Sequence, residues 1–470
     1  MMRKIAEYGL EHLNKEYTQK GRAPIIFDFR GACSGLLNNN KENRYIQYIH
    51  YYPGRIFPYI PLYLLSLNDF AHLDGYLLDP FAGSGTILLE SIINPVIKRN
   101  SIGVEINPLA RLISKVKTTP LDFSKIEQLM QAIQSLCKHV INDKDYIPDF
   151  KNRELWFSYI AIKKLAKLKR AIENLDVDSD FKDFFWICFS SIIRKIAKAD
   201  PYIPPPVVLK PEKYRNNPRK YERLKKYLKE TENPNVWELF ENAVNSNKSK
   251  LNILNRFNEL KDGKTKSKII WDDARDIKKG RLLVRGRINK KLAEKVSSNT
   301  VDIVFTSPPY LTAQKYIRTN KLELFWLGYS EKEVNYFEKT SIGTERIKKD
   351  LDYASLGVKS IDSLTDYVLP KSYERGLMVY KYFKDMLEAL KEMHRLLRNN
   401  GYAILVVGDN KVLDKRVDTY RLLVDAAVSI GFTEICILKD TIRSRSMMTK
   451  RNGTGGLIKN EYVAILKKEA

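Results

Sequence analysis

A five-residue peptide, Thr-Ser-Pro-Pro-Tyr at residues 306–310, constrains this chain more than any other part of the sequence. It directly follows an apolar run, residues 301–305, which predicts a buried strand. Two consecutive prolines end that strand, because neither can donate a backbone hydrogen bond and each fixes its own φ. The stiff loop offers a hydroxyl at Ser307, a carbonyl at Pro308 and an aromatic face at Tyr310. Such a loop can hold a flat ring that carries an amino group, although a plain Pro-Pro turn is the structural alternative.

A second motif, Asp-Pro-Phe-Ala-Gly-Ser-Gly-Thr, occupies residues 79–86. Residues 75–78 before it predict a strand, and the apolar residues after it predict a helix. Its glycines allow a tight turn and let a ligand approach the backbone without interference from a Cβ atom. A further predicted strand, residues 101–107, carries Glu105 at a spacing typical of an acid that binds a ribose diol. The combination predicts a nucleoside-cofactor site, and no lysine follows Gly85 as it would in a phosphate-binding loop.

The two motifs belong to an α/β pattern that a long insertion interrupts. We expect residues 1–118 to form an N-terminal segment and the first half of a cofactor-binding domain. Residues 267–470 would form its second half, with the catalytic loop. A third predicted strand, residues 268–271, precedes Asp273 at the sheet edge where ligands of open α/β folds bind.

The insertion, residues 119–266, has apolar residues at helical spacing. Ser124 and Glu127 have the spacing of a capping box, and a second helix is predicted over residues 154–175. The insertion is therefore predicted to be mainly helical. It is also a candidate region for contact with DNA and recognition of the target.

The positive charge of the chain favours a nucleic acid partner. Lys and Arg number 81 against 56 Asp and Glu, which gives a net charge of +25. Residues 210–229 carry nine basic residues interleaved with tyrosines, a composition that suits phosphates and unstacked bases. A solvated helix and a lysine-rich proteome are the alternative explanations. The candidate DNA-binding residues are Lys210, Lys213, Arg215, Arg219, Lys220, Arg223, Arg443 and Arg445.

Several other classes of protein are disfavoured by the sequence. No run of eighteen uncharged apolar residues occurs, and the first residues lack an apolar signal core, so we expect no membrane segment. The four cysteines are scattered without a Cys-x-x-Cys pair, so neither a metal site nor a disulfide framework is expected. Free cysteines fit a reducing cytoplasm.

The two motifs together resemble those of the amino-methylating DNA methyltransferases, which use S-adenosyl-L-methionine. Serine before Pro-Pro is most similar to their N4-cytosine branch, whereas the N6-adenine branch more often has Asp or Asn there. The resemblance covers roughly residues 45–118 and 267–470, and it implies a Rossmann-like sheet of seven strands flanked by helices. It implies catalytic roles for Ser307, Pro308, Pro309 and Tyr310. The cofactor-binding residues that it implies are Tyr52, Pro53, Arg55, Asp79, Phe81, Gly83, Gly85, Thr86, Glu105, Asn107 and Asp273.

The resemblance also sets the expected reaction, in which the methyl group passes to the exocyclic amine of a base that has left the duplex. Methylation at a ring carbon would need a cysteine nucleophile, typically after proline, and the sequence has no such pair. The alternatives are an N6-adenine DNA methyltransferase, an RNA amino-methyltransferase and an inactive subunit that binds cofactor and DNA. A cognate restriction endonuclease would be a separate chain. Three segments remain candidates for recognising the target sequence, namely residues 119–266, 311–375 and 440–455.

Overall fold

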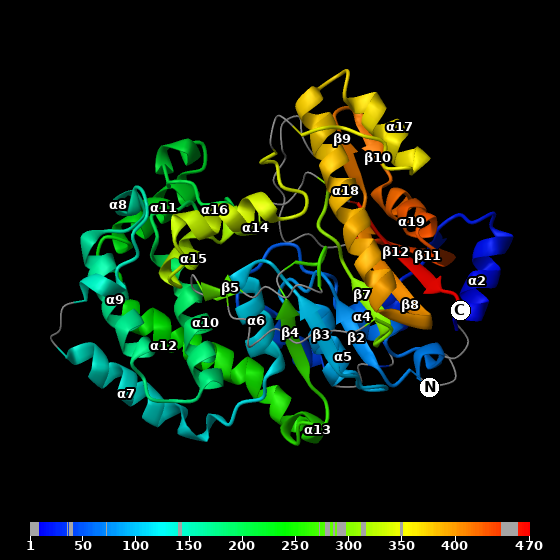
Figure 1. Ribbon diagram of the computed structural model, residues 1–470. Coiled ribbons are helices and arrows are strands. Elements are labelled where there is room, and N and C mark those ends of the chain that lie inside the picture. Colours follow the sequence, from blue (N-terminus) through cyan, green and yellow to red (C-terminus); the bar gives the residue numbers. More distant parts are fainter. Residues whose placement is uncertain are drawn as a thin grey trace.

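An eight-stranded sheet lies at the centre of the computed structural model (Figure 1). The structure describes residues 9–34, 36, 41–71, 73–139, 143–271, 273–277, 283–284, 287–288, 298–311, 316–347, 351–442 and 459–470. The sheet strands, in spatial order, are β1 (Ile25–Ile26), β11 (Phe432–Thr441), β12 (Asn460–Lys468), β8 (Leu397–Gly408), β7 (Val301–Thr306), β2 (Tyr76–Asp79), β3 (Ser101–Val104) and β4 (Ser267–Trp271).

Seven of these strands form the predicted Rossmann-like sheet, and β1 adds a two-residue edge. Strands β8, β7, β2, β3 and β4 are parallel to one another, whereas β12 runs antiparallel between β8 and β11. Every residue of β7 is buried, as expected for a central strand covered on both faces. Because parallel strands end at one edge of the sheet, the predicted motifs after β2, β3, β4 and β7 are brought together there.

Helices flank the sheet and supply its hydrophobic core. The first group consists of α4 (Tyr59–Leu64), α5 (Thr86–Ile93) and α6 (Pro108–Thr118), which pack in sequence against one another. The second group consists of α17 (Lys359–Val368), α18 (Tyr373–Leu396) and α19 (Thr419–Ser429). The N-terminal helix α2 (Leu10–Gln19) contacts β11 at the far edge (Figure 1). The α/β class is therefore confirmed.

The insertion is helical, as predicted, and has its own aromatic core. Its main helices are α7 (Ile126–Lys138), α9 (Tyr159–Glu173), α10 (Ser179–Ile196), α11 (Pro218–Glu230) and α12 (Val236–Leu251). Two local predictions were wrong. Asp122, not Ser124, accepts a backbone hydrogen bond at the turn before α7. The helix predicted over residues 154–175 is broken before Ser158, whose hydroxyl caps α9 by accepting from the Ala161 amide at 3.1 Å.

A segment from the second half of the chain joins this aromatic core. Helix α15 (Lys321–Trp326) contacts α10, and α16 (Glu331–Thr340) follows it. Trp326 is fully buried and meets Phe157 edge-on, while Phe325 stacks on Phe150 with ring centroids 4.3 Å apart. Large apolar side chains on a short helix need a partner surface, and the insertion supplies it. We call residues 119–266 with 316–340 the helical region.

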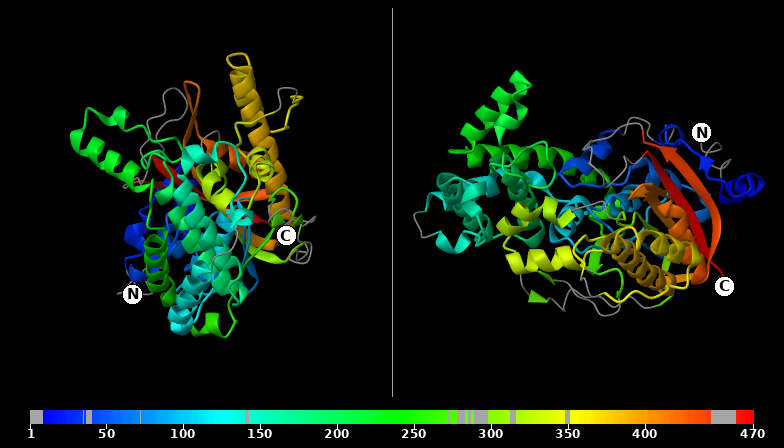
Figure 2. Two further views of the ribbon diagram at one scale, coloured as in Figure 1. Left: turned by 90° about the vertical axis from the view of Figure 1, so that its left-hand side faces the viewer. Right: turned by 90° about the horizontal axis from the view of Figure 1, so that it is seen from above.

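Helix α11 stands out from the rest of the helical region. In both views of Figure 2 it forms an arm that projects beyond the neighbouring helices. Leu224 is its one buried residue, so the arm contributes little to the core. Residues 201–206, which precede this arm, contain no helix.

Candidate functional site

The two sequence motifs meet where β2 and β7 end side by side. These strands are parallel neighbours, with Leu77 opposite Ile303 and Leu78 opposite Val304. Just beyond these pairs, the Thr306 hydroxyl donates to the Asp79 carboxylate at 2.7 Å. The Phe81 amide donates to the same carboxylate oxygen at 3.2 Å.

Asp79 is only 2% exposed. Burial raises the pKa of this carboxyl to about 7, and the hydrogen bonds from Thr306 and Phe81 partly oppose that shift. The side chain does not line the cavity described next, so its role in the geometry is to connect the two loops.

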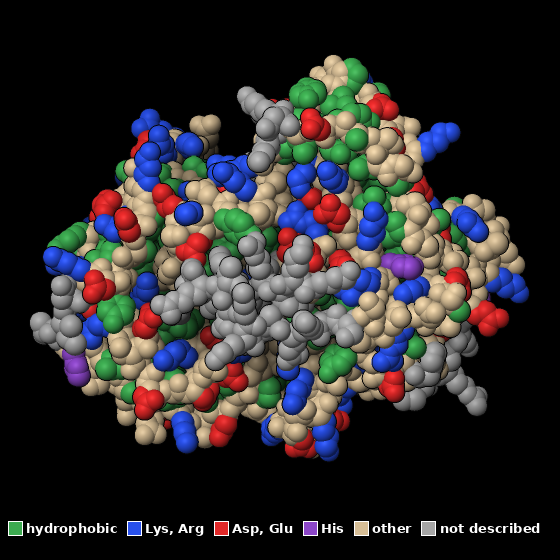
Figure 3. Space-filling model, in the orientation of Figure 1, with side chains coloured by type: hydrophobic (Ala, Val, Ile, Leu, Met, Phe, Trp, Pro, Cys, Tyr) green, Lys and Arg blue, Asp and Glu red, His purple; other side chains and the backbone are tan. Residues whose placement is uncertain are grey.

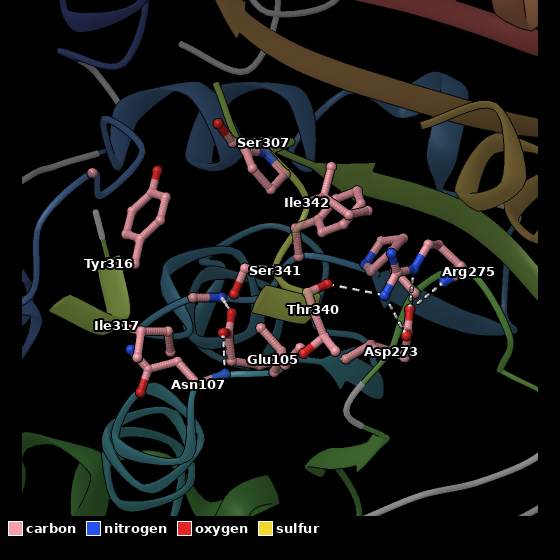
Figure 4. A pocket seen from close by; sticks show the side chains of 18 of the residues that line it. Glu105, Asn107, Asp273, Arg275, Ser307, Tyr316, Ile317, Thr340, Ser341 and Ile342 are labelled. Atoms are coloured by element: carbon pink, nitrogen blue, oxygen red, sulfur yellow. Dashed lines mark hydrogen bonds and ion pairs between the residues drawn. The ribbon is translucent and has the colours of Figure 1, made fainter. Parts of the chain in front are cut away.

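A cleft with about 700 Å³ of open space lies at this edge of the sheet (Figure 4). Ligands of open α/β folds bind at such an edge of the sheet. We call it the first cavity. Its walls come from the ends of β2, β3, β4 and β7, from the turn around Tyr52 and from the end of α16. The predicted residues that line it are Tyr52, Phe81, Gly83, Glu105, Asn107, Asp273, Ser307 and Pro309.

Gly83 and Glu105 form one wall of the first cavity. The Gly83 amide donates to one carboxylate oxygen of Glu105 at 2.7 Å, and the Asn107 amide donates to the other at 2.7 Å. Burial raises the pKa of Glu105, and these two amides with Arg111 act in the opposite direction. Gly83 has φ +50°, and a Cβ atom there would meet nothing closer than Tyr52 at 3.7 Å. The open space beside Gly83 is the cavity itself.

Gly85 and Thr86, which were also predicted to bind the cofactor, do not line the first cavity. Gly85 has φ +74°, and a Cβ atom there would overlap the Ser114 hydroxyl on α6. Its missing side chain therefore allows α5 and α6 to pack, which is separate from ligand approach. Thr86 is buried, and its hydroxyl donates to the Gln47 side-chain oxygen at 3.1 Å, away from the first cavity.

The turn that contains Tyr52, Pro53 and Arg55 separates two cavities. The Tyr52 ring lies parallel to that of Tyr316, with centroids 6.0 Å apart. Pro53 and Arg55 line a second cavity on the other side of the turn, and Tyr52 lines both. The Arg55 guanidinium donates to the Gln47 carbonyl, so it is fixed within the protein.

Asp273 is held by Arg275 at the end of β4. The guanidinium donates to the two carboxylate oxygens at 2.9 and 2.7 Å, and Figure 4 shows the pair at the cavity wall. Burial raises the pKa of Asp273, but the hydrogen bonds and charge of Arg275 outweigh it and leave the pKa below its ordinary value. Arg275 also donates to Asp385 on α18 and to the Thr340 carbonyl, each at 3.0 Å. The ion pair thus ties three elements together around the cavity.

The Pro-Pro loop is fixed through its backbone and through Ser307. The Ser307 hydroxyl donates to the Val406 carbonyl on β8 at 3.0 Å. The Tyr382 hydroxyl on α18 donates to the Pro309 carbonyl at 2.9 Å. Pro308 is buried, and burial raises the pKa of Tyr310 well above its ordinary value, so its phenol is neutral. The loop is rigid, and Ser307 and Pro309 face the first cavity.

Several lining residues were not predicted. Tyr316, Thr340, Ser341 and Ile342 enter the first cavity from the helical region and the residues after it, which carry no recognisable motif (Figure 4). Only the fold brings them to the sheet edge. Arg275 could have been found, because it follows Asp273 by two residues at the end of a predicted strand.

Six of the eight predicted DNA-binding residues lie on the arm or just before it. Lys220 on α11 lies over the rings of Tyr202 and Tyr214, with its ammonium 3.7 and 4.0 Å from their centroids. Figure 3 shows Lys and Arg side chains gathered over this arm. Lys210, Lys213, Arg215, Arg219 and Arg223 belong to the same segment, on α11 or just before it. Arg443 and Arg445 lie outside the described residues.

The described part of the chain has no helix with the length and apolar character needed to cross a membrane. Over the same residues, no group of three or more His, Cys, Asp or Glu side chains is placed to hold a metal ion.

Comparison with known proteins gives three related methyltransferases, while no protein-family model matches the chain. The Type II methyltransferase M.MvaI of Kocuria varians is 27% identical over 398 residues, which cover 80% of each chain. M.BsoBI of Geobacillus stearothermophilus, also a Type II methyltransferase, is 25% identical over 440 residues, 83% of this chain and 78% of the relative. The Type II methyltransferase M.MjaII of Methanocaldococcus jannaschii is 24% identical over 194 residues, 40% of this chain and 35% of the relative.

Proposed function

We propose that this chain, a methyltransferase by its fold and its relatives, is a site-specific DNA methyltransferase that modifies the N4 amine of cytosine. The observation that carries the proposal is the hydrogen bond between Asp79 and Thr306. It joins the glycine loop to the Pro-Pro loop, so that Gly83, Glu105 and Ser307 share one cavity. A cofactor loop and an amine-binding loop that open on one cavity are what a direct methyl transfer needs.

The first cavity fits S-adenosyl-L-methionine. Gly83 leaves space that a Cβ atom would fill, and the Glu105 carboxylate lies at the end of β3, where an acid can accept hydrogen bonds from ribose hydroxyls. Tyr52, Phe81 and Asn107 would line the rest of the bound molecule, and the Asp273–Arg275 pair would hold the wall. Asp79, Gly85 and Thr86 would act indirectly, by shaping the loop. The cofactor supplies a methyl group on a sulfonium sulfur, and that C–S bond breaks as the methyl group forms its bond to nitrogen.

The Ser-Pro-Pro-Tyr loop would position the amine. The Ser307 hydroxyl donates its hydrogen to the Val406 carbonyl, so its oxygen can still accept a hydrogen bond from an NH2 group. The Pro308 carbonyl would accept the second hydrogen. An exocyclic amine is a poor nucleophile because its lone pair is delocalised into the ring, and two acceptors hold it pyramidal and correctly aimed. The nitrogen then releases one proton to solvent.

The substrate would be duplex DNA with the target base flipped out. A base inside the duplex cannot reach a cavity at a sheet edge, and extrusion costs a few kcal/mol. Stacking on Tyr310 would return about 1–3 kcal/mol of that cost. The basic arm would bind phosphates, as would Arg443 and Arg445. The relatives are Type II methyltransferases, and a cognate restriction endonuclease, if present, would be a separate protein.

Transfer of a labelled methyl group tests the proposal. The full chain is incubated with methyl-labelled S-adenosyl-L-methionine and, separately, duplex DNA, single-stranded DNA and RNA. We expect label in duplex DNA and much less with Ser307→Ala. The matched control is Ser429→Ala, because the Ser429 hydroxyl also donates to a backbone carbonyl but lies on α19. Label that enters RNA in preference to DNA would overturn the substrate, and no label in any of the three would overturn the activity.

A further inference from the structure

The Pro-Pro loop is held through its backbone carbonyls as well as through Ser307. The Tyr382 hydroxyl on α18 donates to the Pro309 carbonyl at 2.9 Å. The Asn410 side-chain amide, at the start of β9 (Asn410–Val412), donates to the Leu311 carbonyl. The Tyr310 carbonyl lies between these two in the chain, and the contact that limits its position comes from a third element.

That contact is made by Gly343, in a tight turn directly after α16. The Thr344 amide donates to the Ser341 carbonyl at 3.2 Å, which closes the turn. Gly343 is the third residue of the turn and has φ +78°, a conformation that type II turns require at this position and that glycine adopts without strain. A Cβ atom on Gly343 would lie 2.9 Å from the Tyr310 carbonyl oxygen and 3.7 Å from the Tyr382 ring. The turn is therefore packed directly against the Pro-Pro loop.

The turn is anchored to α16 at both of its ends. The Ser341 amide donates to the Phe337 carbonyl at 3.1 Å. Beyond the turn, the Arg346 guanidinium donates to the Asn335 side chain at 2.9 Å and forms an ion pair with Glu338 at 3.0 Å. Because α16 belongs to the helical region, that region holds the turn in place against the loop.

The position of the Pro-Pro loop decides the geometry of the proposed methyl transfer. The Pro308 carbonyl would accept one hydrogen of the amine, and Tyr310 would stack on the base. Both groups belong to the same short stretch as the two carbonyls that Tyr382 and Gly343 contact. A displacement of about 1 Å in an active site can slow a reaction by a hundredfold, even when it is caused far from the reacting atoms. Contacts that fix this loop are therefore expected to affect the rate of transfer.

We propose that Gly343 and Tyr382 are positioning residues for methyl transfer, which hold the Tyr310 and Pro309 carbonyls so that the loop meets the amine in the correct geometry. The inference rests on the function proposed above and adds two residues to it. Neither residue belongs to the described lining of the first cavity, so both act through the loop. Tyr382 acts through a hydrogen bond. Gly343 acts through its missing side chain, which allows the turn to approach the loop this closely.

A second glycine separates this contact from backbone strain. Gly357, just before α17, has φ +75°, and a Cβ atom there would meet nothing within 4 Å. Gly343→Ala and Gly357→Ala therefore introduce a similar conformational strain, but only Gly343→Ala disturbs the Tyr310 carbonyl.

Both variants are made in the full chain. Single-turnover transfer is measured from saturating S-adenosyl-L-methionine to a duplex with the target sequence, which sequencing of DNA methylated by wild type identifies. Dissociation constants for S-adenosylhomocysteine and for the duplex are measured separately.

We expect Gly343→Ala to slow transfer by roughly thirtyfold to a hundredfold, while both dissociation constants change by less than about threefold. Gly357→Ala should transfer at the wild-type rate. A wild-type rate in Gly343→Ala would overturn the role of this residue, as would an equal loss of rate in the two variants, because strain alone would then explain the effect. A loss of cofactor affinity in proportion to the rate would also overturn it, since the turn would then only support the cofactor wall.

Tyr382→Phe gives a second measurement that does not depend on the glycine variants. It keeps the ring and removes the hydroxyl that donates to Pro309, so transfer should slow roughly tenfold, the effect of one hydrogen bond, with unchanged binding. Tyr17→Phe is the matched control. Tyr17 is also 1% exposed, and its hydroxyl donates to Glu434 at the far edge of the sheet. A rate in Tyr382→Phe equal to that in Tyr17→Phe would overturn the role of the hydroxyl.

Combining the variants tests whether the two residues act on the same loop. The loss of rate in Gly343→Ala/Tyr382→Phe should be smaller than the product of the two single losses. In contrast, Gly357→Ala/Tyr382→Phe should be no slower than Tyr382→Phe alone. A loss equal to or greater than the product would overturn the shared action. Failure of the proposed function is distinguishable, because wild type would then transfer no methyl group to DNA, which would overturn both proposals, whereas normal rates in the variants overturn this inference alone.

Discussion

The Thr306 hydroxyl donates a hydrogen bond to the Asp79 carboxylate at 2.7 Å, so the last residue of β7 is joined to the last residue of β2. These residues are 227 positions apart in the chain. The bond is buried, and it fixes the relative position of the two loops that open on the first cavity. A charge held in this place should make the stability of the protein depend on pH.

Asp79→Asn should stabilise the apoprotein more at pH 8 than at pH 5. Burial raises the folded-state pKa of Asp79 to about 7, against 3.8 as its ordinary value. The folded state therefore keeps a proton that the unfolded state releases, and stability is lost as pH rises from about 4 to about 7. The loss is on the order of a few kcal/mol. The side-chain oxygen of the asparagine can still accept hydrogen bonds from Thr306 and Phe81. Thermal unfolding at both pH values measures the difference, and an equal shift at both would contradict the assignment.

Gly83→Val and Gly85→Ala should fail in different ways. A side chain at Gly83 would enter the first cavity, so calorimetry should show loss of S-adenosyl-L-methionine binding, with the fold retained at a lower stability because φ is +50° there. A side chain at Gly85 would overlap Ser114, so the main effect should be a lower unfolding temperature. Replacing Ser114 by Gly should recover part of the stability of Gly85→Ala. Unchanged cofactor affinity in Gly83→Val would show that this loop does not bind the cofactor.

Ser307→Ala should slow methyl transfer far more than it weakens DNA binding. Loss of one of two acceptors for the amine should lower kcat by roughly a hundredfold. The dissociation constant for DNA should change by less than about threefold, because the phosphate contacts that we propose lie mainly on the arm. Single-turnover rates and equilibrium binding measure the two quantities separately. Ser429→Ala is the control, and a fully active Ser307→Ala would exclude any role for this hydroxyl.

Charge reversal on the arm should weaken DNA binding and reduce its dependence on salt. In the variant, Lys220, Arg223 and Lys226 of α11 are replaced by Glu. Each lost phosphate contact lowers the slope of log K against log salt by about 0.9. In the control variant, Lys15, Lys20 and Arg22 are replaced by Glu. These residues lie on or just after α2, at the other end of the molecule, so the net charge changes by the same amount. If the slope of log K against log salt is the same for both variants as for wild type, the arm makes no phosphate contacts and its charges are only solvated.

The sequence predicted the sheet and the two loops because each is encoded locally. Residues 79–86 and 306–310 have turn residues at fixed positions after apolar runs, and such patterns need no distant partner. The role of Gly85 was not predictable in the same way, since it depends on Ser114 of a different helix. Tyr316 and the residues from Thr340 to Ile342 were missed because only the packing of α15 into the helical region brings them to the cavity.

The identity of the methylated nucleoside is the most direct test of the account. Unmethylated genomic DNA is treated with the wild-type chain and S-adenosyl-L-methionine, digested to nucleosides and analysed by mass spectrometry against standards. We predict N4-methylcytosine as the main product, and much less of it when Ser307→Ala replaces wild type. N6-methyladenine as the main product would correct the base and leave the amine chemistry in place. 5-Methylcytosine, or no methylated nucleoside, would contradict the central claim that the Ser-Pro-Pro-Tyr loop presents an exocyclic amine for methylation.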